Sequence, residues 1–93
     1  MSKLIFRLHA LQRMYSRQIS ELDVRFAIEN GEVIEDYKDD LPYPSKLLSC
    51  RVGIKHLHIV VSLNNSDHET IVITAYEPDP HLWENNFKKR RFK

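Results

Sequence analysis

The stretch that decides the fold is SKLLSCRVGIKHLHIVVSLNNSDHETIVITAY, residues 45–76. Apolar and polar side chains alternate along most of it, and a period of two is typical of strands with one buried face. The alternation predicts strands at Ser45–Ile54, His56–Leu63 and Thr70–Glu77. The cluster Asn64-Asn65-Ser66-Asp67 predicts a turn, because these residue types favour tight turns. We therefore expect three strands joined as antiparallel hairpins.

Two helices are predicted before these strands. Apolar side chains recur at spacings of three and four residues from Arg7 to Arg17, the pattern of an amphipathic helix. Its expected apolar arc consists of Leu8, Leu11, Met14 and Tyr15. Ser20 then begins a second helix, because Ser20 with Asp23 three residues later forms a capping box. Asn30-Gly31 is expected to end this helix with a left-handed residue.

The order of the elements defines the expected architecture. Glu32–Tyr37 alternates again and predicts another strand, whereas Lys38–Pro44 predicts a loop. Asp79-Pro80 is typical of a helix start, so a short last helix is expected from His81 to about Phe87. We predict one α+β domain over residues 1–87, in which the two N-terminal helices pack on a four-stranded antiparallel sheet. A basic tail, residues 88–93, would follow it.

Length and composition exclude several classes of protein. With 93 residues, 42% hydrophobic and 29% charged, the chain is expected to fold as one soluble domain with a single core. No apolar run reaches the roughly 18 residues of a membrane span, so no membrane association is expected. Cys50, the single cysteine, is expected in the core. It cannot form an internal disulfide, which indicates a reducing, cytoplasmic compartment.

Charge is distributed unevenly along the chain. The net charge is +1, but five of the 14 basic residues lie at the C-terminal end, which leaves 9 basic against 13 acidic residues before them. Eight of the acids fall between Glu21 and Asp40. Phosphate contacts are expected from four residues of the tail, with a solvated terminus as the alternative: Lys88, Lys89, Arg90 and Arg91.

Two patterns of histidine and arginine are candidates for chemistry. His56 and His58 are two residues apart on a predicted strand, so both imidazoles point to one face. No third and fourth ligand is near, so we expect no metal, and His58 is assigned acid–base chemistry because histidine titrates near neutrality. The alternative is a half-exposed strand face.

The second pattern lies on the first predicted helix. His9, Arg13 and Arg17 follow one another at one-turn spacing, and guanidinium groups bind phosphate with paired hydrogen bonds. The alternative is a solvated helix face. Arg51 and Tyr76 complete the candidates, and the strand register decides whether they meet His58.

These residue types suit the cleavage of RNA by its own 2′-hydroxyl. A base removes the hydroxyl proton, an acid protonates the leaving 5′-oxygen, and cations stabilise charge on phosphorus, without a protein nucleophile, metal or cofactor. In this hypothesis His58 and His9 act as acid and base, and Tyr76 orients the phosphate. Arg13, Arg17 and Arg51 bind it, with the basic tail on the rest of the RNA.

Several motifs occur in order: HAxxRMxxR (9–17), ISxxDV (19–24), NGEVIEDY (30–37), LHIVV (57–61) and ITxYEP (73–78). Over about residues 8–84 the chain resembles an uncharacterised bacterial family of domains of unknown function. That family is similar in fold to the RelE/BrnT-like ribonuclease toxins, and its members are often encoded beside a zinc-finger antitoxin of the YgiT/MqsA type. The resemblance implies a type II toxin that cleaves mRNA, free or on the ribosome, and is neutralised by a partner antitoxin. RelE-type toxins use lysine, arginine and tyrosine around the sheet, and Tyr76 is the counterpart here.

Two other functions fit the same sequence. A non-catalytic interaction module would dock a basic partner on the acidic stretch Glu29–Asp40. A regulator bound to an antitoxin would reach DNA with its basic tail.

Overall fold

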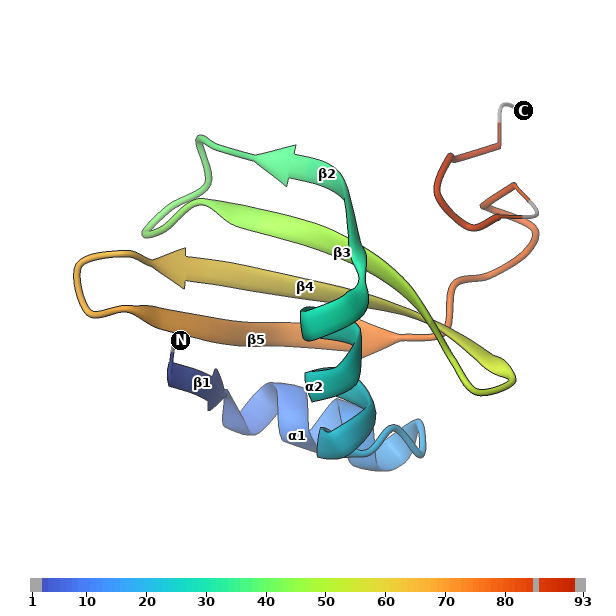
Figure 1. Ribbon diagram of the computed structural model, residues 1–93, viewed down its shortest axis with the longest axis horizontal. Helices are drawn as coiled ribbons and strands as arrows, with labels where there is room; N and C mark the ends of the chain where they lie inside the picture. The colour runs from blue at the N-terminus through green and yellow to red at the C-terminus, as the bar shows by residue number, and fades with distance from the viewer. Residues whose placement is uncertain (1–2, 85, 92–93) are drawn as a thin grey trace.

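The computed structural model describes residues 3–84 and 86–91. Along this part of the chain the elements are β1 (Lys3–Phe6), α1 (Leu8–Ser16), α2 (Glu21–Asn30), β2 (Glu32–Tyr37), β3 (Ser45–Val52), β4 (Lys55–Asn64) and β5 (Glu69–Tyr76). The strands form a five-stranded sheet in the order β1-β5-β4-β3-β2 (Figure 1). No helix of the described residues is both long enough and apolar enough to cross a membrane.

The predicted four-stranded antiparallel sheet is wrong, although the chain is α+β. Lys3–Phe6 forms an additional strand, β1, which pairs in parallel with β5 from Lys3 opposite Glu69 to Phe6 opposite Val72. The other three pairs of neighbouring strands are antiparallel, so the sheet is mixed. A run of four residues is too short to show a period, and its partner lies far along the sequence, so the pattern gave no signal for β1.

Helix α1 lies beside β5 beyond the point where β1 ends (Figure 1). Its buried side chains are Ala10 and Met14. Leu8 and Tyr15, which we expected in the apolar arc, are 71% and 85% exposed. Arg17 follows Ala10 by about two helical turns and so shares its buried face. The helix is therefore rotated relative to the prediction, and Arg17 points to the sheet.

Helix α2 crosses one face of the sheet (Figure 1). The predicted cap is confirmed, because the Asp23 backbone N–H donates to Ser20 Oγ at 3.0 Å. Gly31, however, is extended with φ −77° and not left-handed. A Cβ at Gly31 would lie 2.4 Å from the carbonyl oxygen of Ala27, so lack of space explains the glycine.

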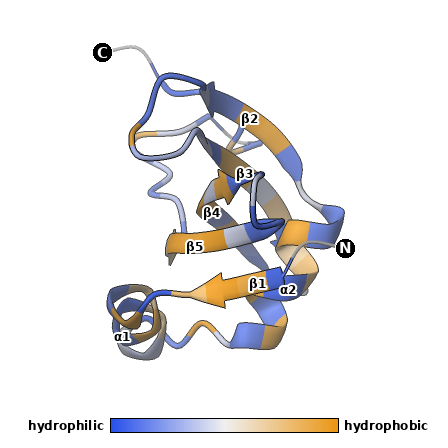
Figure 2. Cartoon of the chain, turned by 90° about the vertical axis from the view of Figure 1, so that its left-hand side faces the viewer, coloured by the Kyte–Doolittle hydropathy of each residue, from blue (hydrophilic) through white to orange (hydrophobic). Residues whose placement is uncertain are grey.

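The core lies between the helices and the sheet, and Figure 2 shows hydrophobic residues along these elements. Its buried members come from both helices, the turn between them and the three central strands. They are Ala10, Met14, Ile19, Val24, Ala27, Leu48, Cys50, Leu57, Ile59, Val61, Val72 and Ala75.

The opposite face of the sheet carries the C-terminal segment, which we define as residues 79–84 and 86–91 (Figure 2). The predicted last helix is wrong for the residues described here, which form turns and one isolated bridge between Trp83 and Arg90. Trp83 is buried and packs on the sheet. The last two residues of the predicted tail, 92 and 93, lie outside the described part of the chain. The C-terminal segment thus covers part of the face on which His58 lies.

Candidate functional site

The strand register brings several candidate side chains together on the face opposite α2. His58 lies opposite Tyr76 on β5 and opposite Ser49 on β3. His56, also on β4, lies opposite Arg51 near the end of β3. Side chains that face each other across neighbouring strands are in contact distance. The register therefore settles that His58 and Tyr76 meet.

His58 is completely buried under the C-terminal segment. Its Nε2 lies 2.6 Å from the carbonyl oxygen of Phe87, and its Nδ1 lies 3.3 Å from the hydroxyl of Tyr76. A carbonyl oxygen can only accept, so Nε2 carries the proton and donates it, and Nδ1 of the neutral ring accepts from Tyr76. The ring of Trp83 packs edge to face on His58, with 4.5 Å between centroids.

Burial lowers the pKa of His58 below its usual value, although the hydrogen bond to the Phe87 carbonyl opposes this shift. His58 is therefore neutral at pH 7. The pKa of Tyr76 is raised, chiefly because the phenol is buried, while the positive charges of Arg90 and Arg17 act in the other direction. The pair consists of a protonated phenol that donates to a neutral imidazole.

Tyr76 lines a cavity of about 570 Å³ at the end of β5, together with Arg17, Trp83 and Arg90. The Nη1 group of Arg17 donates to the Ala75 carbonyl at 2.9 Å, which satisfies an acceptor at the strand edge. The guanidinium of Arg90 stacks over Trp83, 4.5 Å from the ring centroid. Two guanidinium groups are thus fixed beside one phenol.

Two carboxylates, Glu77 and Asp79, line the same cavity. Asp79 Oδ1 accepts a hydrogen bond from the backbone N–H of His81 at 2.8 Å, and this bond partly neutralises the carboxylate. The cavity therefore has fixed donors for an anion, with two carboxylates that limit how much negative charge it accepts.

The other two residues of the histidine and arginine pattern on α1, His9 and Arg13, do not line this cavity. His9 Nε2 and Arg13 Nη2 lie 3.4 Å apart on the exposed side of α1. His9 precedes Arg17 by about two helical turns and Arg13 by about one turn. The structure therefore brings Arg17, His58 and Tyr76 together and leaves His9 and Arg13 outside.

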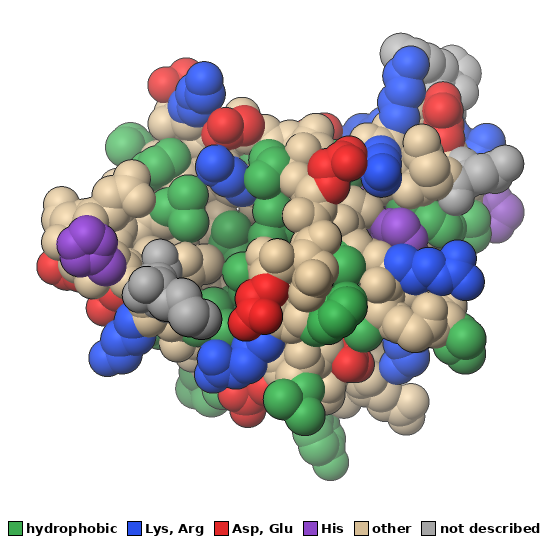
Figure 3. Space-filling model, viewed as in Figure 1, with side chains coloured by type: hydrophobic (Ala, Val, Ile, Leu, Met, Phe, Trp, Pro, Cys, Tyr) green, Lys and Arg blue, Asp and Glu red, His purple; other side chains and the backbone are tan. Residues whose placement is uncertain are grey.

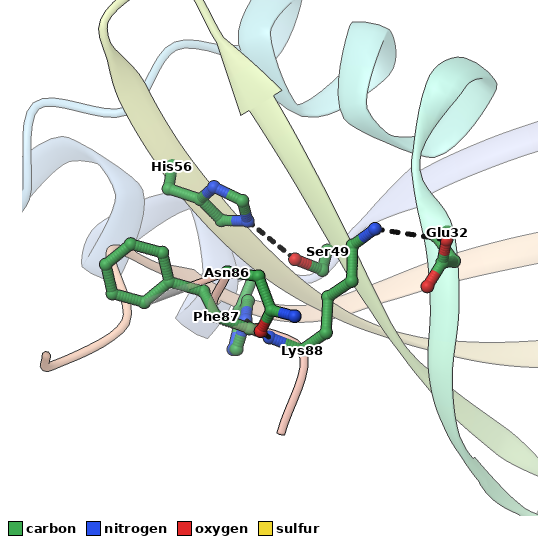
Figure 4. A network of polar contacts seen from close by, with 7 residues as sticks. Glu32, Ser49, His56, Asn86, Phe87 and Lys88 are labelled. Carbon is green, nitrogen blue, oxygen red and sulfur yellow. Dashed lines mark hydrogen bonds and ion pairs between the residues drawn. The ribbon is translucent and has the colours of Figure 1, made fainter. Parts of the chain in front are cut away.

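Arg51 lies at a second cavity, of about 470 Å³, which it lines with Lys55, His56 and Phe87. His56 Nε2 shares a hydrogen bond of 2.6 Å with Ser49 Oγ, and Figure 4 shows this pair beside Phe87 and Lys88. Burial lowers the pKa of His56, and the positive charges of Arg51 and Lys88 lower it further. Arg51 is thus apart from Tyr76 and has a different histidine as its neighbour.

The basic residues of the predicted tail differ in position. Lys88 Nζ lies 3.3 Å from Glu32 Oε1, and Arg90 Nε lies 3.8 Å from Glu35 Oε1 (Figure 4 shows the first pair). Arg91 Nε donates to the Pro80 carbonyl at 2.8 Å, and the Lys89 side chain is exposed. Of these cations, Arg90 is the one that lines the Tyr76 cavity.

Sequence reasoning gave no role to Ser49 or Phe87. Phe87 contacts His58 through its backbone carbonyl. Every residue has this carbonyl, so the identity of the side chain does not predict the contact. Ser49 lies two residues from both Leu47 and Arg51 and so shares their face of β3. Its pairing with His56 depends on the strand register, which the sequence does not give.

Potential metal ligands are scattered in the described part of the chain. Among residues 3–84 and 86–91, no three His, Cys, Asp or Glu side chains lie close enough to hold one ion. Cys50 is buried in the core, and burial raises the pKa of its thiol. The thiol is therefore protonated and packs as an apolar group.

Comparison with known proteins gave one match. The model of the family described as "Domain of unknown function (DUF4258)" matches residues 6–77. The matched region includes Arg17, His58 and Tyr76, whereas Phe87 and Arg90 follow it. The searches of curated proteins and of solved structures found no match.

Proposed function

We propose that this chain, which belongs to the DUF4258 family, is a metal-independent endoribonuclease and the toxin of a type II toxin–antitoxin pair. One observation supports the proposal above the others. Tyr76, hydrogen-bonded to the buried His58, faces a cavity that also presents Arg17 and Arg90. Cleavage by the 2′-hydroxyl of RNA uses a proton acceptor and cations beside the phosphate, together with a proton donor for the leaving oxygen.

In this proposal the 2′-hydroxyl of one nucleotide lies against the Tyr76 oxygen. As the 2′-oxygen attacks phosphorus, its proton passes to the Tyr76 oxygen, and the Tyr76 proton passes to His58 Nδ1. The bond from phosphorus to the 5′-oxygen breaks, and the leaving oxygen takes a proton from water in the cavity. The products are a 2′,3′-cyclic phosphate and a 5′-hydroxyl, and His58 returns its proton through Tyr76 to the hydroxide that this water has become.

Burial of His58 opposes this direction of proton transfer, and one contact, with the Phe87 carbonyl, favours it. The imidazolium formed during the reaction still donates to the Phe87 carbonyl, and this hydrogen bond favours the charged ring. Arg17 and Arg90 stabilise the charge that develops on the phosphate oxygens. His58 acts here as a base through Tyr76, because it has no exposed surface of its own.

Cleavage of a labelled mRNA, free and on ribosomes and with EDTA present, tests the proposal. Tyr76→Phe and His58→Gln should each cut at least about 100-fold more slowly than the wild type. Tyr15→Phe is the matched control, because Tyr15 is exposed on α1 and should leave the rate unchanged. Arg17→Ala should lose more activity than Arg13→Ala, one turn away and outside the cavity.

The assignment would be refuted by Tyr76→Phe cutting at the wild-type rate. It would also be refuted if the wild type cut neither free nor ribosome-bound mRNA. Products with a 3′-hydroxyl in place of a cyclic phosphate would rule out the 2′-hydroxyl mechanism.

The toxin role includes a protein partner, a zinc-finger antitoxin that silences the activity. Expression of the wild type should arrest bacterial growth, and Tyr76→Phe should not. A non-catalytic docking module would give the same growth for both chains. The docking alternative has less support, because Glu32 and Glu35 of the acidic stretch already pair with Lys88 and Arg90. On the face shown in Figure 3, acidic side chains are also interspersed with basic and hydrophobic ones.

A further inference from the structure

The cavity beside Phe87 has the size of a small-molecule site. Its volume of about 470 Å³ falls in the range of ligand pockets in proteins. It lies where the turn between β3 and β4 meets the chain that follows β5, and Arg51, Lys55 and His56 line it from the strands. The cavity shares Glu77 with the Tyr76 cavity. Phe87, whose carbonyl accepts from His58, lines it, but Arg17, His58, Tyr76 and Arg90 do not.

Two cations of this cavity are held in place by single hydrogen bonds. Arg51 Nε donates to the Gly53 carbonyl at 3.3 Å, which leaves the terminal nitrogens of the guanidinium for a ligand. Lys55 Nζ donates to the Gln18 carbonyl at 3.2 Å and retains two further protons. Glu77 is the carboxylate among the lining residues, so the lining carries more positive than negative charge.

Aromatic and apolar groups form the rest of the wall. The ring of Phe87 lies 4.8 Å from that of His56 between centroids. Phe87 has φ 57°, a left-handed conformation that a bulky residue rarely adopts. Such strain persists where the surroundings hold it and is common at ligand sites. Ile54, also in the lining, is 95% exposed, so an apolar surface is open at the rim.

We propose that this cavity binds a single nucleotide, with its phosphate on Arg51 and Lys55 and its base against Phe87 and Ile54. A guanidinium and an ammonium together match a phosphate, and an aromatic ring stacks on any base. A ligand that carried only phosphate would leave the apolar part of the wall unused. This proposal does not rest on the ribonuclease assignment, because it requires no cleavage and places no contact on Arg17, His58 or Tyr76.

Two reporters separate the two cavities in one titration of the full chain. The imidazole signals of His56 in ¹H–¹³C spectra report on the cavity proposed here, and the fluorescence of Trp83, the single tryptophan, reports on the Tyr76 cavity. Adenosine monophosphate and uridine monophosphate should shift the His56 signals. Adenosine and inorganic phosphate should each bind at least about fivefold more weakly than adenosine monophosphate, because each lacks one half of the contacts.

Substitutions then test the assigned contacts. Arg51→Ala should weaken binding of adenosine monophosphate at least about tenfold, since it removes a charged hydrogen-bond donor. Arg7→Ala makes the same change at an exposed arginine that does not line the cavity, and it should bind like the wild type. Phe87→Leu should reduce the advantage of the nucleotide over inorganic phosphate. Far-UV circular dichroism verifies that each variant folds.

Four results would overturn the proposal. They are no shift of His56 at millimolar nucleotide, equal affinity of Arg51→Ala and Arg7→Ala, inorganic phosphate binding as tightly as the nucleotide, and a response of Trp83 without one of His56. Each of them leaves the cleavage assay with Tyr76→Phe unaffected, so the two proposals can fail separately.

Discussion

His58 should make the stability of this fold depend on pH. It is buried, and burial lowers its pKa in the folded state, whereas the pKa in the unfolded chain is about 6.5. Below about pH 6.5 the unfolded chain therefore binds a proton that the folded chain binds less readily. The free energy of unfolding then falls as the pH falls, by up to about 1.4 kcal/mol for each pH unit below 6.5.

Acidification from about pH 7.5 to about pH 5.5 should thus remove up to about 1.4 kcal/mol through His58 alone. The variant His58→Gln isolates this part, because its amide can still donate to the Phe87 carbonyl but does not titrate. Urea unfolding followed by circular dichroism at both pH values gives the free energies. The wild type should lose more stability than His58→Gln. His81→Gln, at an exposed position, should behave like the wild type. Parallel losses in the wild type and His58→Gln would refute the reasoning.

Three further experiments test the fold. Gly31→Ala should lower the free energy of unfolding by about 1–3 kcal/mol in urea titrations, because the new Cβ would meet the Ala27 carbonyl oxygen at 2.4 Å; a change within about 0.5 kcal/mol would show that α2 moves freely. Ser20→Ala should cost about 1 kcal/mol through loss of the cap, measured in the same way, and an unchanged value would remove the cap from the account. A double-mutant cycle on Lys88 and Glu32 should give a coupling below about 1 kcal/mol, because both side chains are largely exposed; a larger coupling would mean that the pair holds the C-terminal segment in place.

The strands that follow α2 were predictable because they are joined by hairpins. Each of the four begins and ends within two residues of its expected bounds; the third, expected at His56–Leu63, is Lys55–Asn64. Alternation and turn residues are local signals, and antiparallel neighbours need nothing else. β1 gave no such signal, because a parallel pair joins segments that are distant in sequence.

The site was less predictable than the fold. Residue type selected His58, Tyr76 and Arg17, but only the register and the rotation of α1 show which of them meet. The rotation of α1 could have been predicted from Ala10, because a small residue allows a helix to pack closely on a sheet. Arg17 shares a helix face with Ala10. His9 lies outside this arc and remains on the surface.

The distribution of charge along the sequence indicates that the C-terminal segment folds back onto the domain. An acidic stretch and a basic end in one small chain can pair with each other, and Lys88 and Arg90 do contact Glu32 and Glu35. Such exposed pairs contribute at most about 1 kcal/mol each. Burial of an indole such as Trp83, by contrast, contributes several kcal/mol, about 5 for roughly 200 Å² of apolar area.

By these magnitudes, burial of Trp83 contributes more to holding the C-terminal segment on the sheet than the two ion pairs together. The C-terminal segment also determines how buried His58 is and which hydrogen bonds it makes. Without Trp83 and the Phe87 carbonyl above it, His58 would be a histidine on a half-exposed strand face, which is the alternative that its sequence position allows. With them, it is a neutral, buried imidazole that donates its N–H to a carbonyl and accepts a hydrogen bond from Tyr76. The matched family region ends at residue 77, so the groups that give His58 this environment come from the part of the chain beyond it.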